Sequence, residues 1–208
     1  MTITDATLTD AGHGPTGAGR VLVLGCGALA REILAIKSAN KLDHIDLACL
    51  PAILHNTPAR IVPALREALD TYQSQYDTVF LAYGDCGTGG ALENLAKERG
   101  VAMLPGAHCY AFFDGVEQFA AREEYTAFYL TDFLARQFDA FVIRPLGLDR
   151  HPELRDAYFG NYETLVYLAQ TSDPALEAKA KAAAKALGLT YVLRPTGYGD
   201  LAPALTLL

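Results

Sequence analysis

The chain has 208 residues, enough for one compact domain with a substantial core. Its formal net charge of −7 argues against nucleic-acid binding, because phosphate recognition needs clustered Lys and Arg. No apolar run approaches the roughly 18 residues of a membrane span, which argues against a membrane protein.

The first residues predict neither a secretory signal nor an ordered element. Residues 1–19 lack the basic start and the apolar stretch of a signal peptide. They are rich in Thr, Gly and Asp, so we expect a flexible tail. We therefore expect a cytoplasmic protein. In that reducing compartment, its four cysteines would bind metal or react more often than they would form disulfides.

The next part of the chain alternates continuous apolar runs with helical patterns. The apolar runs predict four strands, at 20–26, 44–50, 77–84 and 101–105. The patterns between them predict three helices, at 28–40, 59–76 and 91–100. Because the strands show no polar alternation, we expect them to be buried on both faces, as in a parallel sheet.

The second part of the chain predicts a long helical stretch, broken once, and then three more strands. The helical stretch covers 116–138, and the strands fall at 139–145, 164–170 and 189–195. Two helices separate them, at 153–160 and 173–188, the latter capped by Asp173. We predict one α/β domain over 20–208. Its sheet would be doubly wound and mostly parallel, with about seven strands built from two βα halves in a Rossmann-like arrangement.

Residues that bind soft metals follow four successive predicted strands. Cys26, His55 and Cys86 follow the first three, and the neighbours His108 and Cys109 follow the fourth. The carboxyl ends of parallel strands lie along one edge of a sheet, so these residues can converge there. Thiolates and imidazoles suit Zn²⁺ or Fe²⁺. We predict a metal site formed by these residues, with Cys109 as the additional candidate.

Cys86 has the strongest local chemistry and is also a candidate catalytic residue. It lies in the glycine-rich segment 83–90, between a strand and a helix. Backbone N–H groups and the helix dipole there would favour the thiolate, the form that binds metal or attacks an electrophile. The alternative is a sharp turn in which Cys86 only fills space. Cys49 is interpreted as a core residue.

A glycine-rich segment and three polar residues can each be interpreted either structurally or functionally. The segment 25–30 matches the G-x-G-x-x-A dinucleotide fingerprint, but Asp46 lies inside the second strand rather than at its tip, so a tight turn is favoured. Asp132, Tyr162 and Asp200 stand among apolar residues and either cap turns or support a site. We count Asp132 among the candidate catalytic residues.

Taken in order, several segments resemble an uncharacterised bacterial and archaeal family, catalogued as domain of unknown function sixteen-thirty-eight. The matching segments are the glycine-cysteine turn at Cys26, Leu54–Pro58, Tyr83–Gly87, Pro105–His108 and the helix Tyr129–Leu134. The family usually reads Pro-Arg-Ala-His-Asp-Cys where this chain has Pro105-Gly106-Ala107-His108-Cys109-Tyr110. The cysteine has moved by one position, or Cys109 substitutes for it.

This resemblance implies a part in one-carbon metabolism, because such proteins tend to be encoded near corrinoid and trimethylamine-methyltransferase-like proteins. We carry three hypotheses. The first is a metal-dependent protein of methyl transfer that activates a thiol or another methyl acceptor, with a small-molecule substrate or a corrinoid or methyltransferase protein as its partner. The second is a metal-free accessory protein that binds a corrinoid or methyltransferase partner. The third is a thiol enzyme with Cys86 as nucleophile and His108 or His55 as base. Tyr158 and Phe159 are candidates for a homo-oligomer contact.

Overall fold

The computed structural model describes residues 3–208, which form two compact units. The first unit contains the described residues up to Phe112 together with Tyr198–Leu208, and the second contains Phe113–Gly197. Each unit has its own parallel sheet, with strand orders β2-β1-β3-β4 and β5-β6-β7. The α/β class and the parallel pairing are therefore confirmed, but the prediction of one seven-stranded sheet is wrong. β4 has only two residues, Ala102–Met103, and β5 pairs with β6.

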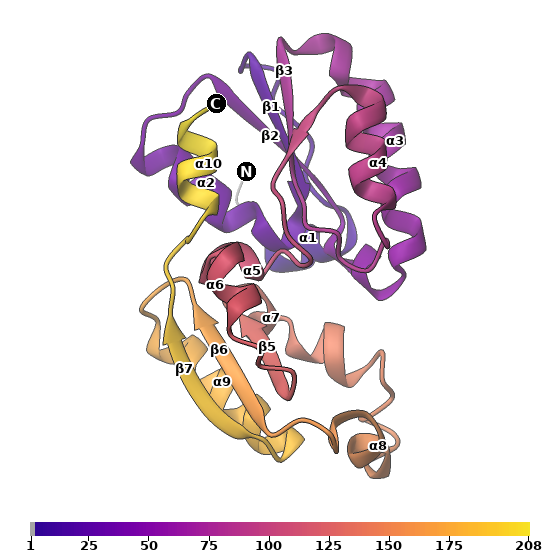
Figure 1. Ribbon diagram of the computed structural model, residues 1–208, viewed down its shortest axis with the longest axis vertical. Coiled ribbons are helices and arrows are strands. Elements are labelled where there is room, and N and C mark those ends of the chain that lie inside the picture. The colour runs from indigo at the N-terminus through magenta and orange to yellow at the C-terminus, as the bar shows by residue number, and fades with distance from the viewer. Residues whose placement is uncertain (1–2) are drawn as a thin grey trace. The chain divides into compact units, whose positions relative to one another are not determined.

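The first unit is a parallel sheet with helices on both faces. Its strands are β1 (Val21–Cys26), β2 (Ile45–Leu50), β3 (Thr78–Ala82) and β4 (Ala102–Met103). Its α-helices are α1 (Asp5–Asp10), α2 (Ala30–Ala39), α3 (Ile61–Tyr72), α4 (Ala91–Arg99) and α10 (Leu201–Thr206). Short helices are η1 (Gly27–Leu29), η2 (Ala52–Asn56), η3 (Pro58–Arg60) and η4 (Gln73–Gln75). In Figure 1, α3 and α4 lie together on one side of the sheet, and α2 and α10 lie together on the other.

Apolar periodicity explains how these elements form a core. All six residues of β1 are buried, which fits a central strand covered on both faces. α3 buries Ile61, Leu65, Ala68 and Leu69, a spacing that places them on one helical face. α4 ends where predicted, because Gly100 adopts a left-handed conformation (φ 64°).

The second unit has a smaller sheet with its own core. Its strands are β5 (Ala127–Thr131), β6 (Thr164–Ala169) and β7 (Thr190–Pro195). Its helices include α6 (Val116–Ala121), α7 (Asp132–Arg136), α8 (Arg155–Phe159) and α9 (Pro174–Leu187), with η6 at Pro152–Leu154. The four-residue α5 (Ala111–Asp114) spans the boundary between the units in sequence. The predicted cap is present: the Asp173 carboxylate accepts hydrogen bonds from the N–H groups of Ala175 and Leu176.

Two elements of the second unit differ from the prediction. Residues 127–131, expected to be helical, form β5, which pairs with β6 along its whole length. Residues 139–143, expected to be a strand, form a π-helix (η5, Asp139–Ile143). A short apolar run does not by itself distinguish a buried strand from a buried helical turn. Here Phe141 packs edge-on against Phe133 of α7, with ring centroids 5.5 Å apart, and this local contact favours the helical form.

Residues 3–19, expected to be a flexible tail, are attached to the first sheet. α1 is capped by Thr4, and its Leu8 is fully buried. His13 forms an antiparallel bridge with Cys49, with both N···O distances 2.8 Å. The Asp46 carboxylate accepts hydrogen bonds from the N–H groups of Thr16 and Gly17. A carboxylate inside β2 thus holds this segment against the edge strand.

The two aromatic residues predicted as an oligomer contact differ in their exposure. Tyr158 is exposed, but Phe159 is buried in the core of the second unit, where it contacts Phe128 edge-on at 5.3 Å. The proposed contact patch is therefore reduced to Tyr158. Within residues 3–208, no helix has the length and apolar character needed to cross a membrane.

Candidate metal centre

The first sheet brings the loops after its strands to one edge. Its order is β2-β1-β3-β4, so the chain moves from β1 to β2 and then to β3 on the other side of β1. The strand order therefore reverses between β1 and β3, and open α/β sheets bind ligands beyond the strand ends at such a point. Cys26 is the last residue of β1, and Cys86 follows the end of β3 by four residues.

The loop that carries Cys86 is held in place by Asp85. The Asp85 carboxylate accepts hydrogen bonds from the Thr88 hydroxyl at 2.7 Å and from the N–H groups of Gly89 and Gly90 at 3.0 and 2.7 Å. Cys86 itself has a left-handed backbone, with φ 49°. That conformation costs a non-glycine residue roughly 1–2 kcal/mol, so the surrounding hydrogen bonds must maintain it. The sequence therefore fixes the direction of the Cys86 side chain through its glycine-rich neighbours.

Cys109 reaches Cys86 because two backbone segments approach closely. The N–H of Asp85 donates to Gly106 O at 2.9 Å, and the N–H of Cys86 donates to Ala107 O at 2.8 Å. A Cβ on Gly84 would lie only 2.7 Å from the backbone carbon of His108, so no larger residue fits there without a shift. The resulting distance between the sulfur atoms of Cys86 and Cys109 is 3.2 Å.

His55 approaches the two thiols from η2, directly after β2. Its Nδ1 lies 3.1 Å from Ala52 O and 3.6 Å from Cys26 Sγ. A carbonyl oxygen only accepts hydrogen bonds, so the contact with Ala52 requires the proton on Nδ1. In the neutral ring this leaves the lone pair on Nε2, the usual arrangement for a metal-binding histidine whose other nitrogen is anchored.

Together these loops form a cluster of three ligand side chains. One ligand atom from each of His55, Cys86 and Cys109 lies within 4.8 Å of the others. Two thiolates on one tetrahedral Zn²⁺ stand roughly 3.8 Å apart, because each Zn–S bond is about 2.3 Å long. The two sulfurs would therefore separate by about half an ångström to bind an ion. Nitrogen and sulfur donors of this kind suit Zn²⁺ or Fe²⁺.

The electrostatics of the cluster favour a thiolate on Cys86. The hydrogen bond with Cys109, together with the hydrogen bond and charge of His55, outweighs the effect of burial and lowers the pKa of Cys86 to about 4. The pKa of Cys109 is raised, because its thiol donates to Cys86 and is buried. Burial lowers the pKa of His55, but the neighbouring charge of Cys26 and the bonds to Cys26 and Cys86 raise it well above its usual value. A bound cation would stabilise this negative charge beside the imidazole, because metal ions bind thiols in their deprotonated form.

The predicted ligands do not all belong to this cluster. Cys26 contacts Nδ1 of His55 and accepts a hydrogen bond from the N–H of Ala28 at 3.3 Å, so it lies behind the histidine. His108 is outside the group of converging ligand atoms, and its ring stacks on Tyr110 at 4.9 Å. Cys109, the additional candidate, takes the place expected for His108.

Asp132 belongs to the second unit, where its carboxylate is fully engaged. It accepts hydrogen bonds from the Tyr167 hydroxyl at 2.6 Å, from the Gln170 N–H at 3.1 Å, and from the N–H and hydroxyl of Thr171 at 3.0 and 2.5 Å. The side chain is 1% exposed. These bonds join the start of α7 to the end of β6. The arrangement supports a structural role for a carboxylate that we had considered as a catalytic candidate.

Tyr83 is a member of the site that the sequence analysis did not single out. Its side chain is fully buried, and its ring lies parallel to that of His55, with centroids 6.1 Å and planes 6° apart. Its hydroxyl has no hydrogen-bond partner in the described structure. The sequence feature that could have indicated Tyr83 is its position directly before Gly84, at the end of an otherwise apolar predicted strand.

The N-terminal helix α1 fills the space beside the glycine turn that follows β1. A Cβ on Gly27 would lie 2.2 Å from the carbonyl oxygen of Leu8 in α1. The close approach that Gly27 allows is therefore that of the N-terminal helix. Asp46 is likewise engaged by residues 16 and 17. These contacts support the tight-turn reading of the segment 25–30 over the dinucleotide reading.

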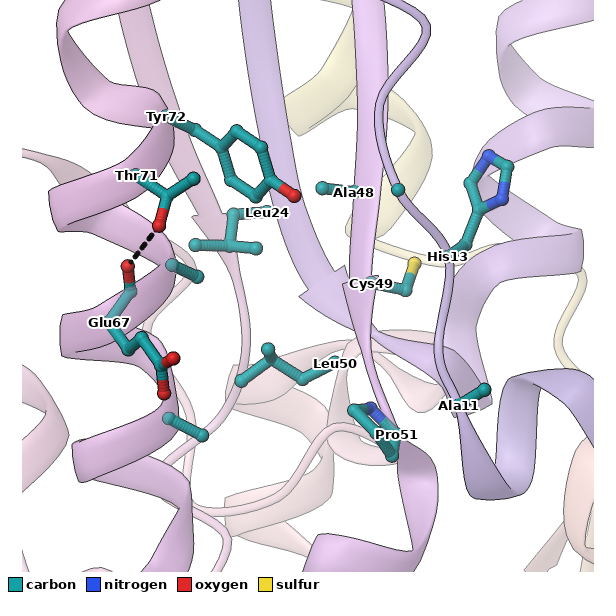
Figure 2. Close-up of a pocket in the computed structure, with 13 residues that line it drawn as sticks. Ala11, His13, Leu24, Ala48, Cys49, Leu50, Pro51, Glu67, Thr71 and Tyr72 are labelled. Atoms are coloured by element: carbon teal, nitrogen blue, oxygen red, sulfur yellow. Dashed lines mark hydrogen bonds between the residues drawn. The ribbon is translucent and has the colours of Figure 1, made fainter.

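A pocket of about 280 Å³ lies elsewhere in the first unit, between α3 and the edge of the sheet. In Figure 2, the ring of Tyr72 extends from α3 toward Ala48, with Leu24 next to it and Leu50 farther along the lining of the pocket. Cys49 borders this pocket, whereas the three clustered ligands do not. The pocket and the metal centre are therefore separate features.

A protein-family comparison gives the identity of the chain. The family model described as "Protein of unknown function (DUF1638)" matches residues 49–205. The chain belongs to this family. The matched region of this DUF1638 protein contains His55, Tyr83, Cys86 and Cys109, whereas Cys26 precedes it. Neither the curated proteins nor the solved structures gave a match.

Proposed function

We propose that this DUF1638 protein binds one Zn²⁺ or Fe²⁺ through His55, Cys86 and Cys109 and uses the metal to activate a thiol in methyl transfer. The convergence of these three ligand atoms within 4.8 Å carries the proposal. Three protein ligands with a fourth position open are typical of catalytic zinc sites, and the same Cys₂His set occurs in alcohol dehydrogenase. Structural sites instead use four protein ligands.

The position of Cys26 supports an open fourth position. Its sulfur lies at Nδ1 of His55, whereas the metal would bind the other ring nitrogen. Cys26 would therefore orient His55, in the way that neighbouring groups orient metal-binding histidines. The order β2-β1-β3-β4 also fits a Rossmann-like half, with the site at the reversal of strand order.

The chemistry of such a centre suits a thiol acceptor. A bound cation stabilises the deprotonated form of its ligand, so a thiol bound at the fourth position would be held as a thiolate. That sulfur would attack a methyl carbon, form the S–C bond and break the bond between the methyl group and its donor. The methyl donor that we propose is a corrinoid or methyltransferase protein, in keeping with the one-carbon role implied by the family resemblance.

Metal analysis of anaerobically purified protein tests the proposal. We expect about one equivalent of zinc or iron in the native protein and less than about one tenth in Cys86→Ala and Cys109→Ala, because two ligands do not retain the ion. Cys49→Ala is the matched control, since Cys49 is equally buried but lies outside the cluster. Equal metal content in all four proteins, or only trace metal in the native protein, would refute the proposal.

A metal-free thiol enzyme is the second candidate. The observation that favours it is the hydrogen-bonded contact of Cys86 with Cys109 and His55, which gives Cys86 a pKa of about 4. Iodoacetamide labelling separates the two functions. If the purified protein contains no metal and Cys86 is alkylated at a rate that stays level from about pH 5 to 8, the thiol enzyme is supported. An accessory protein would show neither metal nor turnover, and would instead co-purify with its partner.

A further inference from the structure

The Tyr83 hydroxyl is a buried polar group without a partner. The side chain is 0% exposed and its oxygen has no hydrogen-bond partner in residues 3–208. A buried hydroxyl without a hydrogen-bond partner destabilises the folded protein. Native proteins pair most such groups, and an unpaired one at a candidate site is a reason to look for a ligand or water that would complete the bond. The described residues around Tyr83 do not supply that partner.

Two contacts place Tyr83 next to the proposed metal ligands, one made by its own ring and one made by the following residue. Its ring stacks parallel to the imidazole of His55. The next residue, Gly84, donates its N–H to the sulfur of Cys109 at 3.3 Å. A phenol has an ordinary pKa of about 10, so the Tyr83 hydroxyl is protonated at neutral pH and can act as a donor.

We propose that the Tyr83 hydroxyl donates a hydrogen bond to a small thiolate bound at the fourth position of the metal. This inference rests on the proposed metal centre. The incoming thiol R–SH would bind as R–S⁻ and release its proton to solvent, while Tyr83 keeps its own proton. Charge-assisted hydrogen bonds of this kind are the strong ones, and they select an anion over a neutral ligand.

Burial limits the size of that thiol. Cys86 and Cys109 are 9% and 8% exposed, and Tyr83 is fully enclosed. The pocket drawn in Figure 2 does not include any of these side chains. Because these side chains are so little exposed, we expect a thiol with one or two carbon atoms to bind in preference to a tripeptide thiol such as glutathione. Tyr83 and the enclosure together define the substrate class as a small alkyl thiol.

Thiol titration of the Co²⁺-loaded full-length protein tests this inference. Methanethiol binding is followed through the sulfur-to-cobalt absorption band. We expect Tyr83→Phe to keep one equivalent of metal but to weaken methanethiol binding about ten-fold or more, because one hydrogen bond to a charged ligand is lost. Tyr76→Phe, which removes a hydroxyl bonded to Asp46 at 2.9 Å, is expected to bind methanethiol normally.

The stability of the metal-free variants separates a ligand-binding role from a structural one. Tyr83→Phe is expected to keep or raise the melting temperature, because it removes an unpaired buried hydroxyl, whereas Tyr76→Phe is expected to lower it. If the native protein binds no metal, the proposed metal centre itself is refuted. Unchanged methanethiol binding in a metal-loaded Tyr83→Phe variant, or glutathione binding as tightly as methanethiol, would overturn the inference alone.

Discussion

At the scale of single residues, the cluster of His55, Cys86 and Cys109 depends on how closely two backbone segments approach. Gly84 is placed where a Cβ would lie 2.7 Å from the backbone of His108 and 2.9 Å from the N–H nitrogen of Cys109. That space lets Cys109 reach the sulfur of Cys86 at 3.2 Å. Backbone atoms cannot rotate away as a flexible side chain would, so a methyl group here must displace the segment that carries a ligand.

We therefore expect Gly84→Ala to weaken metal binding by about ten-fold or more, the range typical when a support of a ligand is disturbed. Competition with a chromophoric chelator measures the affinity. Gly14→Ala is the matched control, because a Cβ at Gly14 has no neighbour within 4 Å. If the two alanine variants bind the metal equally well, the close approach at Gly84 does not position Cys109.

At the scale of elements, the edge of the first sheet is closed by the N-terminal segment through Asp46 of β2. The buried Asp46 carboxylate accepts hydrogen bonds from the N–H groups of Thr16, Gly17 and Leu47 and from the Tyr76 hydroxyl. Burial alone would raise its pKa, but these bonds outweigh burial and lower the pKa below the usual value. Asp46 therefore attaches the N-terminal segment to the edge strand β2. This segment covers β2, so the edge of the sheet is not left exposed for pairing with another chain.

Because its pKa is lowered on folding, ionised Asp46 stabilises the folded state above its unfolded pKa of about 3.9. This stabilisation is lost as the pH falls through the lower folded value. We expect Asp46→Asn to reduce the free energy of unfolding by roughly 1–3 kcal/mol at pH 7, with the difference from the native protein shrinking below about pH 4. Urea unfolding at several pH values measures this. Asp43→Asn, at an exposed site before β2, is the control, and an equal loss at pH 3 and pH 7 would contradict the role of the charge.

At the scale of the whole molecule, the two units have separate sheets, and the candidate ligands lie in only one of them. The three clustered ligands all belong to the first unit. The second unit has its own core around Leu130, Leu165 and Tyr167 and uses its buried carboxylate, Asp132, to join α7 to β6. An ion bound by the first unit stabilises only the states in which its ligands are assembled.

We therefore expect metal removal to raise hydrogen-exchange rates in the loops that hold the ligands, residues 52–56, 84–90 and 106–111. Exchange within residues 127–131 and 164–169, the central strands of the second unit, should stay unchanged. Mass spectrometry of the metal-loaded and chelator-treated protein measures both sets in one experiment. A uniform loss of protection throughout the chain would show that the metal stabilises both units together.

The sequence by itself determined the α/β class and six of the seven strand positions, because these depend on local apolar periodicity. It also showed that His and Cys residues follow the strands, because this depends on residue type alone. Only the tertiary structure decided that the strands form two sheets, that 127–131 is a strand and that 139–143 is a helix, since short apolar runs take the form that their partners stabilise. It also decided which candidates meet. Cys109 joins His55 and Cys86, whereas His108 does not, because the direction of adjacent side chains follows from the path of the backbone beside Gly84 and not from the order of residues.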